Sequence, residues 1–422
     1  MARQITLDEL DLSAWIRPGD GVVFGQGTAE PLGLTAKLVE QRSGYSGAQV
    51  FVPTAFSDTF QPQHADHLRF SGTGGIGSMR RLASSGALDP IPCHISSVGK
   101  FISEGLIASD VVMLLVSPPN EHGEYSLGLV NDYLRAAIER ARVVIAEVSE
   151  HVPWVHCDQP LLEEEITVAV HTDTMPGELP MAAFTDRERQ IAAHLQPFIP
   201  DRATLQVGIG AVPEAILASL GDRRDLGLHS GMLGDSVVDF IEKGVITNAY
   251  KGIDPGVSVT GALFGTRDKL YKHAHQNPAL RLCSTRYTHD FRTFMSVNNL
   301  VSLNSALEVD LTGQVNAEAI GSNYFGAVGG QVDFVRAAAM SGGVSIIALP
   351  ATGKKNDSRI VSALSGPVTT ARSDVDLIAT EYGVARLKGL GLRARIRAMV
   401  AIAAPEHRDA LLHEARKTWR DL

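Results

Sequence analysis

The chain has 422 residues, too many for one small core, and its length predicts two or three domains, of which we favour two. Its formal net charge of −9 and the lack of any Lys/Arg-rich run argue against a nucleic-acid partner, because neutralising phosphates requires a basic face. No apolar run is long enough for a membrane span, and three widely separated cysteines without CxxC spacing indicate a reducing, cytoplasmic location.

Short runs rich in β-branched residues, such as 111–116 (VVMLLV), are bounded by turn residues and predict buried strands. Segments with helical spacing lie between them, so the pattern predicts an α/β fold with largely parallel sheets. The polar, proline-containing stretch 173–201 separates two such regions. We therefore predict domains at 1–185 and 186–422, with Thr185 capping a helix that opens the second.

The loop 116–133 joins a predicted buried strand to a predicted helix, a position at which open α/β sheets usually contact ligands. His122 in this loop could titrate or coordinate, although a lone loop histidine is more often a structural hydrogen-bonding group. No cluster of residues in the chain has zinc-site spacing, so no metal is expected.

A predicted strand ending in LQVGIG leads through Gly208 and Gly210 to a helix that has Pro213 near its first turn. Such a helix start can receive a phosphate or an oxyanion, although a tight connecting turn explains the motif equally well. Pro213 occupies a position where the dinucleotide fingerprint requires glycine, which argues against a dehydrogenase.

Residues 303–338 combine two acidic residues on an apolar strand with a glycine-rich loop. Glu308 and Asp310 alternate with apolar residues and therefore share one strand face, which a solvated sheet edge would explain. Gly329 and Gly330 lie in a loop that can bring backbone N–H groups close to an anion.

A basic segment follows, with Lys354, Lys355 and Arg359 in an otherwise acidic chain. These side chains could bind a phosphate-bearing tail. A solvated turn is the alternative interpretation.

Taken together, these segments resemble the acetyl-CoA hydrolase and 4-hydroxybutyrate or acetate CoA-transferase family over most of the chain. The similarity is carried, in the family's order, by VSPPNEHGEYSLG, VGIGAVPEAI, VVDFIEKGVITN, NSALEVDLTGQVNAEAIG, GAVGGQVDFVRAA and ATEYGVARLKG. It implies two similar open α/β domains with the active site in the cleft between them. It also implies coenzyme A, bound as an acyl-CoA substrate, a small carboxylate as second substrate, and a homodimer.

In that family a glutamate attacks the thioester and forms covalent intermediates. The segment LGLHSGMLGD places Gly231 at the position of this glutamate, two residues after His229. The family's usual nucleophile is therefore absent at this position. The resemblance also places Glu381 near the reaction centre.

The resemblance assigns further residues to binding. Backbone N–H groups of Val207, Gly329 and Gly330 would stabilise the thioester and acyl oxygens. Asn298 and Asn299 would lie beside the substrate. The full set expected to bind CoA is Gly208, Gly210, Pro213, Asn298, Asn299, Lys354, Lys355 and Arg359.

Three hypotheses follow from Gly231. Another carboxylate, from Glu308, Glu381 or Asp235, could replace the nucleophile in CoA transfer. Alternatively, water could attack with His229 or Glu381 as general base, hydrolysing a thioester or a related C–C bond. The third hypothesis is a non-catalytic acyl-CoA-binding protein. Structural roles, as a buried hydrogen-bond acceptor for Glu308 and as a turn-orienting residue for His229, are left open.

Overall fold

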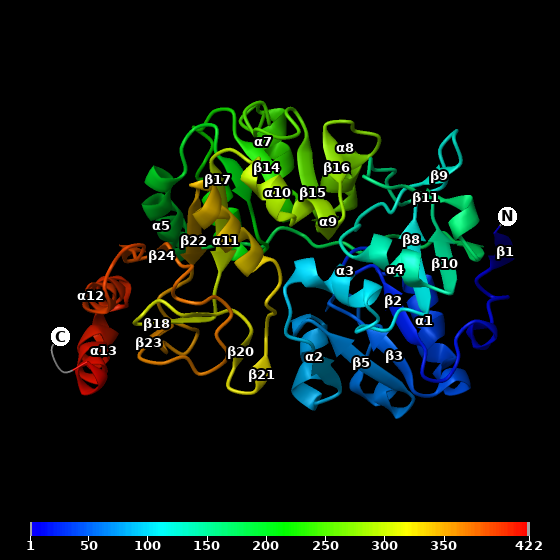
Figure 1. Ribbon diagram of the computed structural model, residues 1–422, viewed down its shortest axis with the longest axis horizontal. Coiled ribbons are helices and arrows are strands. Elements are labelled where there is room, and N and C mark those ends of the chain that lie inside the picture. The colour runs from blue at the N-terminus through cyan, green and yellow to red at the C-terminus, as the bar shows by residue number, and fades with distance from the viewer. Residues whose placement is uncertain (1, 420–422) are drawn as a thin grey trace.

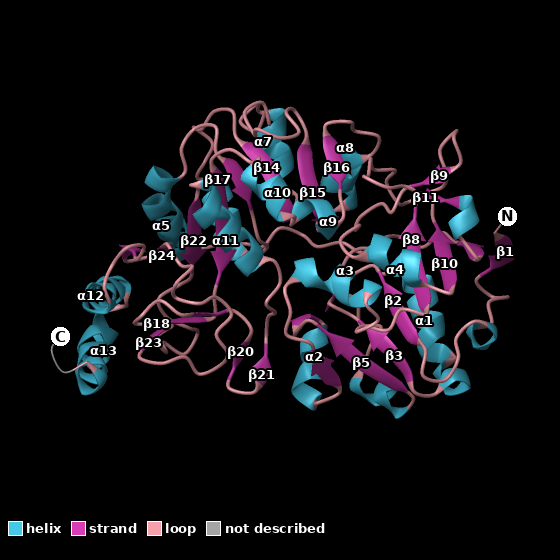
Figure 2. Cartoon of the chain, viewed as in Figure 1, coloured by secondary structure: helices cyan, strands magenta, loops and turns pink. Residues whose placement is uncertain are grey.

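The computed structural model describes residues 2–419 and confirms the α/β class, with two eight-stranded sheets that are each flanked by helices (Figures 1 and 2). The first sheet has the order β1-β12-β10-β8-β2-β3-β5-β7, and all of its strand pairs are parallel. Its strands are β1 (Arg3–Thr6), β2 (Gly21–Phe24), β3 (Ala48–Phe51), β5 (Leu68–Gly72), β7 (Leu88–Pro90), β8 (Val111–Val116), β10 (Val143–Val148) and β12 (Val168–His171). Its helices are α1 (Leu32–Glu40), α2 (Met79–Ser85), α3 (Ile95–Ser103) and α4 (Leu134–Arg140).

The second sheet has the order β16-β15-β14-β13-β17-β22-β24-β25 and is parallel except that β25 runs antiparallel to β24. Its strands are β13 (Thr204–Gln206), β14 (Gly227–Leu233), β15 (Ser258–Leu263), β16 (Leu280–Leu282), β17 (Leu300–Ser305), β22 (Val344–Ala348), β24 (Leu377–Thr380) and β25 (Gly383–Arg386). The helices of this half are α5 (Asp186–Leu195), α6 (Ala211–Ala218), α7 (Ser236–Glu242), α8 (Lys272–Ala274), α9 (Thr285–Thr288), α10 (Phe291–Met295), α11 (Gln331–Ser341), α12 (Leu392–Ile402) and α13 (Pro405–Thr418).

Short strand pairs and one three-stranded sheet lie outside the two main sheets. They comprise β4 (Thr54–Ala55), β6 (Ile76–Gly77), β9 (Glu124–Tyr125), β11 (Leu161–Leu162), β18 (Glu308–Asp310), β19 (Val315–Asn316), β20 (Ala319–Ile320), β21 (Asn323–Tyr324) and β23 (Ile360–Val361). The β20–β21 hairpin lies next to α2 of the first domain (Figure 1). There Arg80 donates a hydrogen bond to the carbonyl of Phe325, and its guanidinium lies 5.2 Å from the centroid of that ring.

The central strands are buried on both faces, which explains why they are continuous apolar runs rather than alternating ones. Every residue of β8 and β10 is buried, as predicted for residues 111–116. One cluster of buried apolar side chains extends from the first sheet into the second. The two domains therefore share a hydrophobic interface that holds their facing loops in place.

The connection between the sheets contains the expected helix start. Thr185 accepts a hydrogen bond from the backbone of Arg187, and Glu188 reaches back to Thr185 in a capping box, so the predicted cap is confirmed. The predicted boundary at 185/186 lies after the last strand of the first sheet and before the first strand of the second. Among residues 2–419, no helix combines the length and apolar character needed to cross a membrane.

Candidate active site

A cavity of about 540 Å³ lies between the two domains. Its walls are mostly apolar, and its lining comes from loops at the carboxyl ends of parallel strands in both sheets, where open α/β folds place ligands. The first domain contributes Gln26, Thr54, Thr73, Arg80, Ile95 and Asp132. The second contributes Val207, Gly208, Gly231, His289, Gly329 and Gly330, among others.

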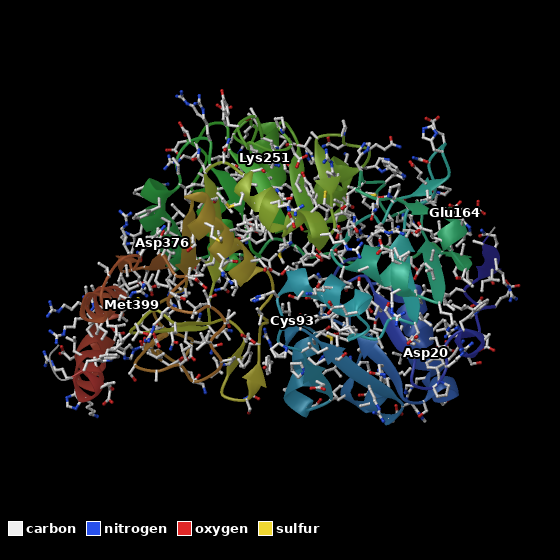
Figure 3. The ribbon with its side chains drawn as sticks, viewed as in Figure 1. Asp20, Cys93, Glu164, Lys251, Asp376 and Met399 are labelled. Carbon is white, nitrogen blue, oxygen red and sulfur yellow. The ribbon has the colours of Figure 1, made fainter. Side chains whose placement is uncertain are left out.

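Backbone contacts join the two domains at this cavity. The N–H of Ile95, at the start of α3, donates to the carbonyl of Gly329 at 2.9 Å. Cys93, labelled in Figure 3, precedes α3 in the middle of the view, where the first domain faces the second. The glycine loop before α11 is therefore held directly against the first domain.

The predicted backbone donors Val207, Gly329 and Gly330 line the cavity, as does Gly208, which was expected to contact CoA. The N–H of Val207, however, already donates to Ser230 Oγ at 3.2 Å. The N–H groups of Gly208 and Gly330 make no backbone or side-chain hydrogen bond within residues 2–419. Gly330 also caps α11, so its N–H lies at the positive end of a helix.

Gly231 lies in β14 and lines the cavity, at the position where the resemblance places the nucleophile. A Cβ atom built on Gly231 would lie 3.2 Å from Cε1 and 3.3 Å from Nε2 of His289. The imidazole therefore borders the space that a side chain at position 231 would enter. Sequence analysis missed His289, because its segment STRYTHDF has no motif and only the fold brings it to Gly231.

The ring of His289 is buried and held from both sides. It packs edge-on against Phe334, with centroids 4.9 Å apart, and its Nδ1 lies 2.8 Å from Thr288 Oγ1. Nε2 is buried and has no hydrogen-bond partner within the described chain. Burial, and to a lesser extent the charge of His229, lowers the pKa of His289 to about 3, so the ring is neutral at pH 7.

Asp132 is the acidic residue of the cavity lining. It accepts a hydrogen bond from Gln26 Nε2 at 2.5 Å, and its Oδ1 lies 2.2 Å from the ideal Cβ position of Gly261, so a side chain at position 261 would clash with it. Its φ of 26° is unusual for a residue other than glycine. Burial raises the pKa of Asp132 to about 7, although the hydrogen bond from Gln26 opposes the shift.

The loop 116–133 reaches the cavity through Asp132 and not through His122, the residue that the sequence suggested. His122 is exposed and lies 3.6 Å from its neighbour Glu121, outside the cavity lining. Asp132, at the other end of the loop, faces the cavity. The available signal was its position two residues before the helix that follows a buried strand.

His229 is buried beside the cavity but is not part of its lining. Its Nε2 lies 2.9 Å from the carbonyl oxygen of Thr288, and this contact orients α9. Burial and the nearby Lys251, labelled in Figure 3, lower the pKa of His229 to about 4. This geometry gives His229 an orienting role.

Glu381 and Asp235 also make structural contacts away from the cavity lining. Glu381 accepts a hydrogen bond from the N–H of Ala351 at 2.8 Å and lies 3.6 Å from Arg187. Asp235 accepts hydrogen bonds from the backbone and the hydroxyl of Thr266. Neither carboxylate is placed to replace a nucleophile at position 231.

Glu308 lies on β18 and is buried, so the expected solvated edge is wrong and the buried-acceptor alternative is confirmed. Its Oε1 accepts hydrogen bonds from the N–H of Ser365, the N–H of Gly366 and Asn316 Nδ2. Asp310 is buried as well and accepts hydrogen bonds from the turn that follows it. Residues 365 and 366, which are distant in sequence, cover β18. The alternating pattern of the strand cannot reveal this burial.

Glu308→Gln is expected to lower the free energy of unfolding by about 1–3 kcal/mol, because an amide cannot accept charge-assisted bonds from all of these donors. Acyl-CoA turnover per folded molecule should be unchanged. Urea unfolding and steady-state kinetics would measure both, with the exposed Glu121→Gln as control. Lost turnover in a fully stable variant would instead support a catalytic Glu308.

The remaining predicted CoA contacts are dispersed. Pro213 lines the cavity and Gly210 caps α6 beside it. Asn298 and Asn299 are exposed and precede β17, at the amino end of that strand rather than the carboxyl end that faces the cavity. The basic residues follow β22, where Lys354 and Lys355 are exposed and Arg359 is half-buried.

Comparison with known proteins gives consistent matches. The acetyl-CoA hydrolase/transferase N-terminal domain matches residues 7–177, and the C-terminal domain of the same name matches residues 265–415. The chain is 38% identical over 404 residues to the 4-hydroxybutyrate coenzyme A transferase of Clostridium kluyveri, with 94% of each chain covered.

Solved structures agree. RipA from Yersinia pestis superimposes with a TM-score of 0.91 at 30% identity, covering 99% of this chain and 98% of RipA. The 4-hydroxybutyrate CoA-transferase from Porphyromonas gingivalis superimposes with a TM-score of 0.83 at 35% identity, covering 99% and 98%. Position 231 lies outside both matched ranges, in β14 of the second sheet.

Proposed function

Because this chain belongs to the acetyl-CoA hydrolase/transferase family, we propose that it is an acyl-CoA-processing enzyme that moves CoA between an acyl-CoA and a small carboxylate. The observation that supports this most is the cavity between the domains. Its apolar walls suit an acyl chain, and the N–H groups of Gly208 and Gly330 are available to a thioester oxygen. The names of the relatives, which are CoA transferases, agree with this activity.

Gly231 supports a second candidate, hydrolysis of the acyl-CoA by water. Glycine has no side chain that can form an acyl anhydride, so the family's covalent route cannot pass through this position. The candidate carboxylates Glu308, Glu381 and Asp235 are all engaged in structural hydrogen bonds. A site that offers the N–H groups of Gly208 and Gly330 to an oxyanion, but has no nucleophilic side chain at position 231, favours water as the attacking group.

The phosphates of CoA are proposed to contact the basic turn after β22. Lys354 and Lys355 are exposed there, and Arg187 donates to the carbonyl of Thr352 in the same turn. A homodimer and a cytoplasmic location complete the proposal. The three cysteines, all free in the described chain, support a reducing compartment.

The test is to incubate the pure protein with a panel of acyl-CoAs, with and without acetate, and to follow free thiol and new acyl-CoA by mass spectrometry. New acyl-CoA that appears only with acetate would establish transfer. Free CoA without acetate would establish hydrolysis. CoA binding without turnover would contradict both activities and leave a non-catalytic acyl-CoA-binding protein.

A further inference from the structure

We propose that His289 is the general base of this site and activates a water molecule for attack on the thioester carbon. The inference rests on the proposed function, because it assumes an acyl-CoA thioester in the interdomain cavity. It names a residue that can perform the chemistry for which position 231 has no side chain.

The position of the imidazole is the first argument. His289 Nε2 lies 3.3 Å from the ideal Cβ position of Gly231 and 2.9 Å from that of Gly330. The nitrogen therefore lies close to both Gly231, at the position of the family's nucleophile, and Gly330, whose N–H has no hydrogen-bond partner within the described chain. Side chains at either glycine would crowd it, so both glycines are consistent with a functional histidine between them.

We assign to the ring the tautomer with the proton on Nδ1. Thr288 Oγ1 lies 3.2 Å from the carbonyl oxygen of Ser284 and 2.8 Å from His289 Nδ1, and a hydroxyl that donates to the carbonyl accepts the Nδ1 proton. Nε2 then carries the lone pair. It is buried without a partner within the described chain, and His289 lines the cavity, so a bound water or ligand group would supply the missing partner.

Burial keeps His289 neutral at pH 7, the form that can accept a proton, but it also lowers the pKa to about 3 and weakens the ring as a base. The assignment therefore rests on the position of the ring in the cavity and not on its pKa.

The other ionisable lining residues do not compete for this role. Arg80, which also lines the cavity, is a permanent cation whose guanidinium lies over Phe325. Asp132 is bound to Gln26 and, with its raised pKa, is partly protonated at neutral pH.

The chemical step is a general-base hydrolysis. Water oxygen forms a bond to the thioester carbon while one water proton passes to His289 Nε2, and the oxyanion accepts hydrogen bonds from Gly208 and Gly330 N–H. The C–S bond then breaks, and the proton moves from the imidazolium to the departing sulfur. The products are free CoA thiol and a carboxylic acid, which ionises.

His289→Ala is expected to lower kcat for acyl-CoA hydrolysis, measured without acetate, by about 100- to 10,000-fold. KM should change less than kcat, because the ring is proposed to act on the attacking water. Added imidazole should restore part of the lost rate, which a purely structural histidine would not allow. The wild type should show a solvent deuterium isotope effect on kcat, because a proton is transferred to His289. The residual activity of His289→Ala should not show it.

His289→Asn keeps a donor for Thr288 Oγ1 and serves as the second variant if alanine disturbs folding. The matched control is His122→Ala, an exposed histidine outside the cavity, which should retain wild-type rates. Hydrolysis that survives in folded His289 variants, or a wild type that only transfers CoA to acetate, would overturn this inference and leave the proposed function standing. A wild type that consumes no acyl-CoA would overturn the proposed function itself.

Discussion

Gly231→Glu alone is expected to lower the free energy of unfolding by about 1–3 kcal/mol, because the first atom of the new side chain crowds the His289 ring at the edge of the cavity. The backbone does not contribute to this cost, since Gly231 lies in β14 and is not among the residues with positive φ. The cost comes from the imidazole, which lies 3.2–3.3 Å from the first atom of the introduced side chain.

Gly231→Glu combined with His289→Ala is expected to gain CoA transfer through a covalent enzyme–CoA thioester. Removing the ring frees the space for a carboxylate that faces the cavity. The intermediate would appear as an increase in intact protein mass on incubation with acyl-CoA. The two substitutions should also couple favourably in a double-mutant cycle, by about 1–2 kcal/mol.

Gly231→Ala combined with His289→Ala is the control for the double variant, because it has the same cleared space without a carboxylate. It should form no covalent intermediate. If Gly231→Glu alone were as stable as the wild type and formed the thioester with His289 in place, the ring would not be the obstacle that the structure indicates.

Asp132→Asn is expected to raise the free energy of unfolding at pH 8 by about 1–3 kcal/mol, because the charged carboxylate is disfavoured by burial at that pH. The folded-state pKa is about 7, well above the ordinary value of about 3.9 that applies to the unfolded chain. Between these values the folded protein binds more protons than the unfolded chain, so stability falls as the pH rises through the window.

Asparagine abolishes this pH dependence because it carries no charge, and it can still accept the hydrogen bond from Gln26. It also tolerates the positive φ at position 132. Urea unfolding at pH 5 and pH 8 measures the effect, with the exposed Asp89→Asn as control. If wild type and Asp132→Asn lost stability equally between pH 5 and pH 8, the burial cost assigned to this carboxylate would be wrong.

Much of the fold could be predicted because local patterns are strong where strands are fully buried. Residues 111–116 form β8, and Thr185 caps α5 as its side-chain chemistry indicates. Glu308 shows where local pattern fails. Its alternation with apolar residues suggested a solvated face, but Ser365 and Gly366, distant in the chain, supply donors that bury it.

The sequence by itself determined the α/β class, the family resemblance, and the absence of a nucleophilic carboxylate at Gly231. These depend on residue identity and short-range spacing, which are visible in one dimension. Only the tertiary structure decided that His289, rather than His229, lines the cavity beside Gly231, and that Asp132 is the cavity's carboxyl group. The physical reason is that parallel sheets collect loops from separate parts of the chain at the carboxyl ends of their strands. Which side chains meet there, and which lose water to burial, depends on packing between two domains that no local pattern records.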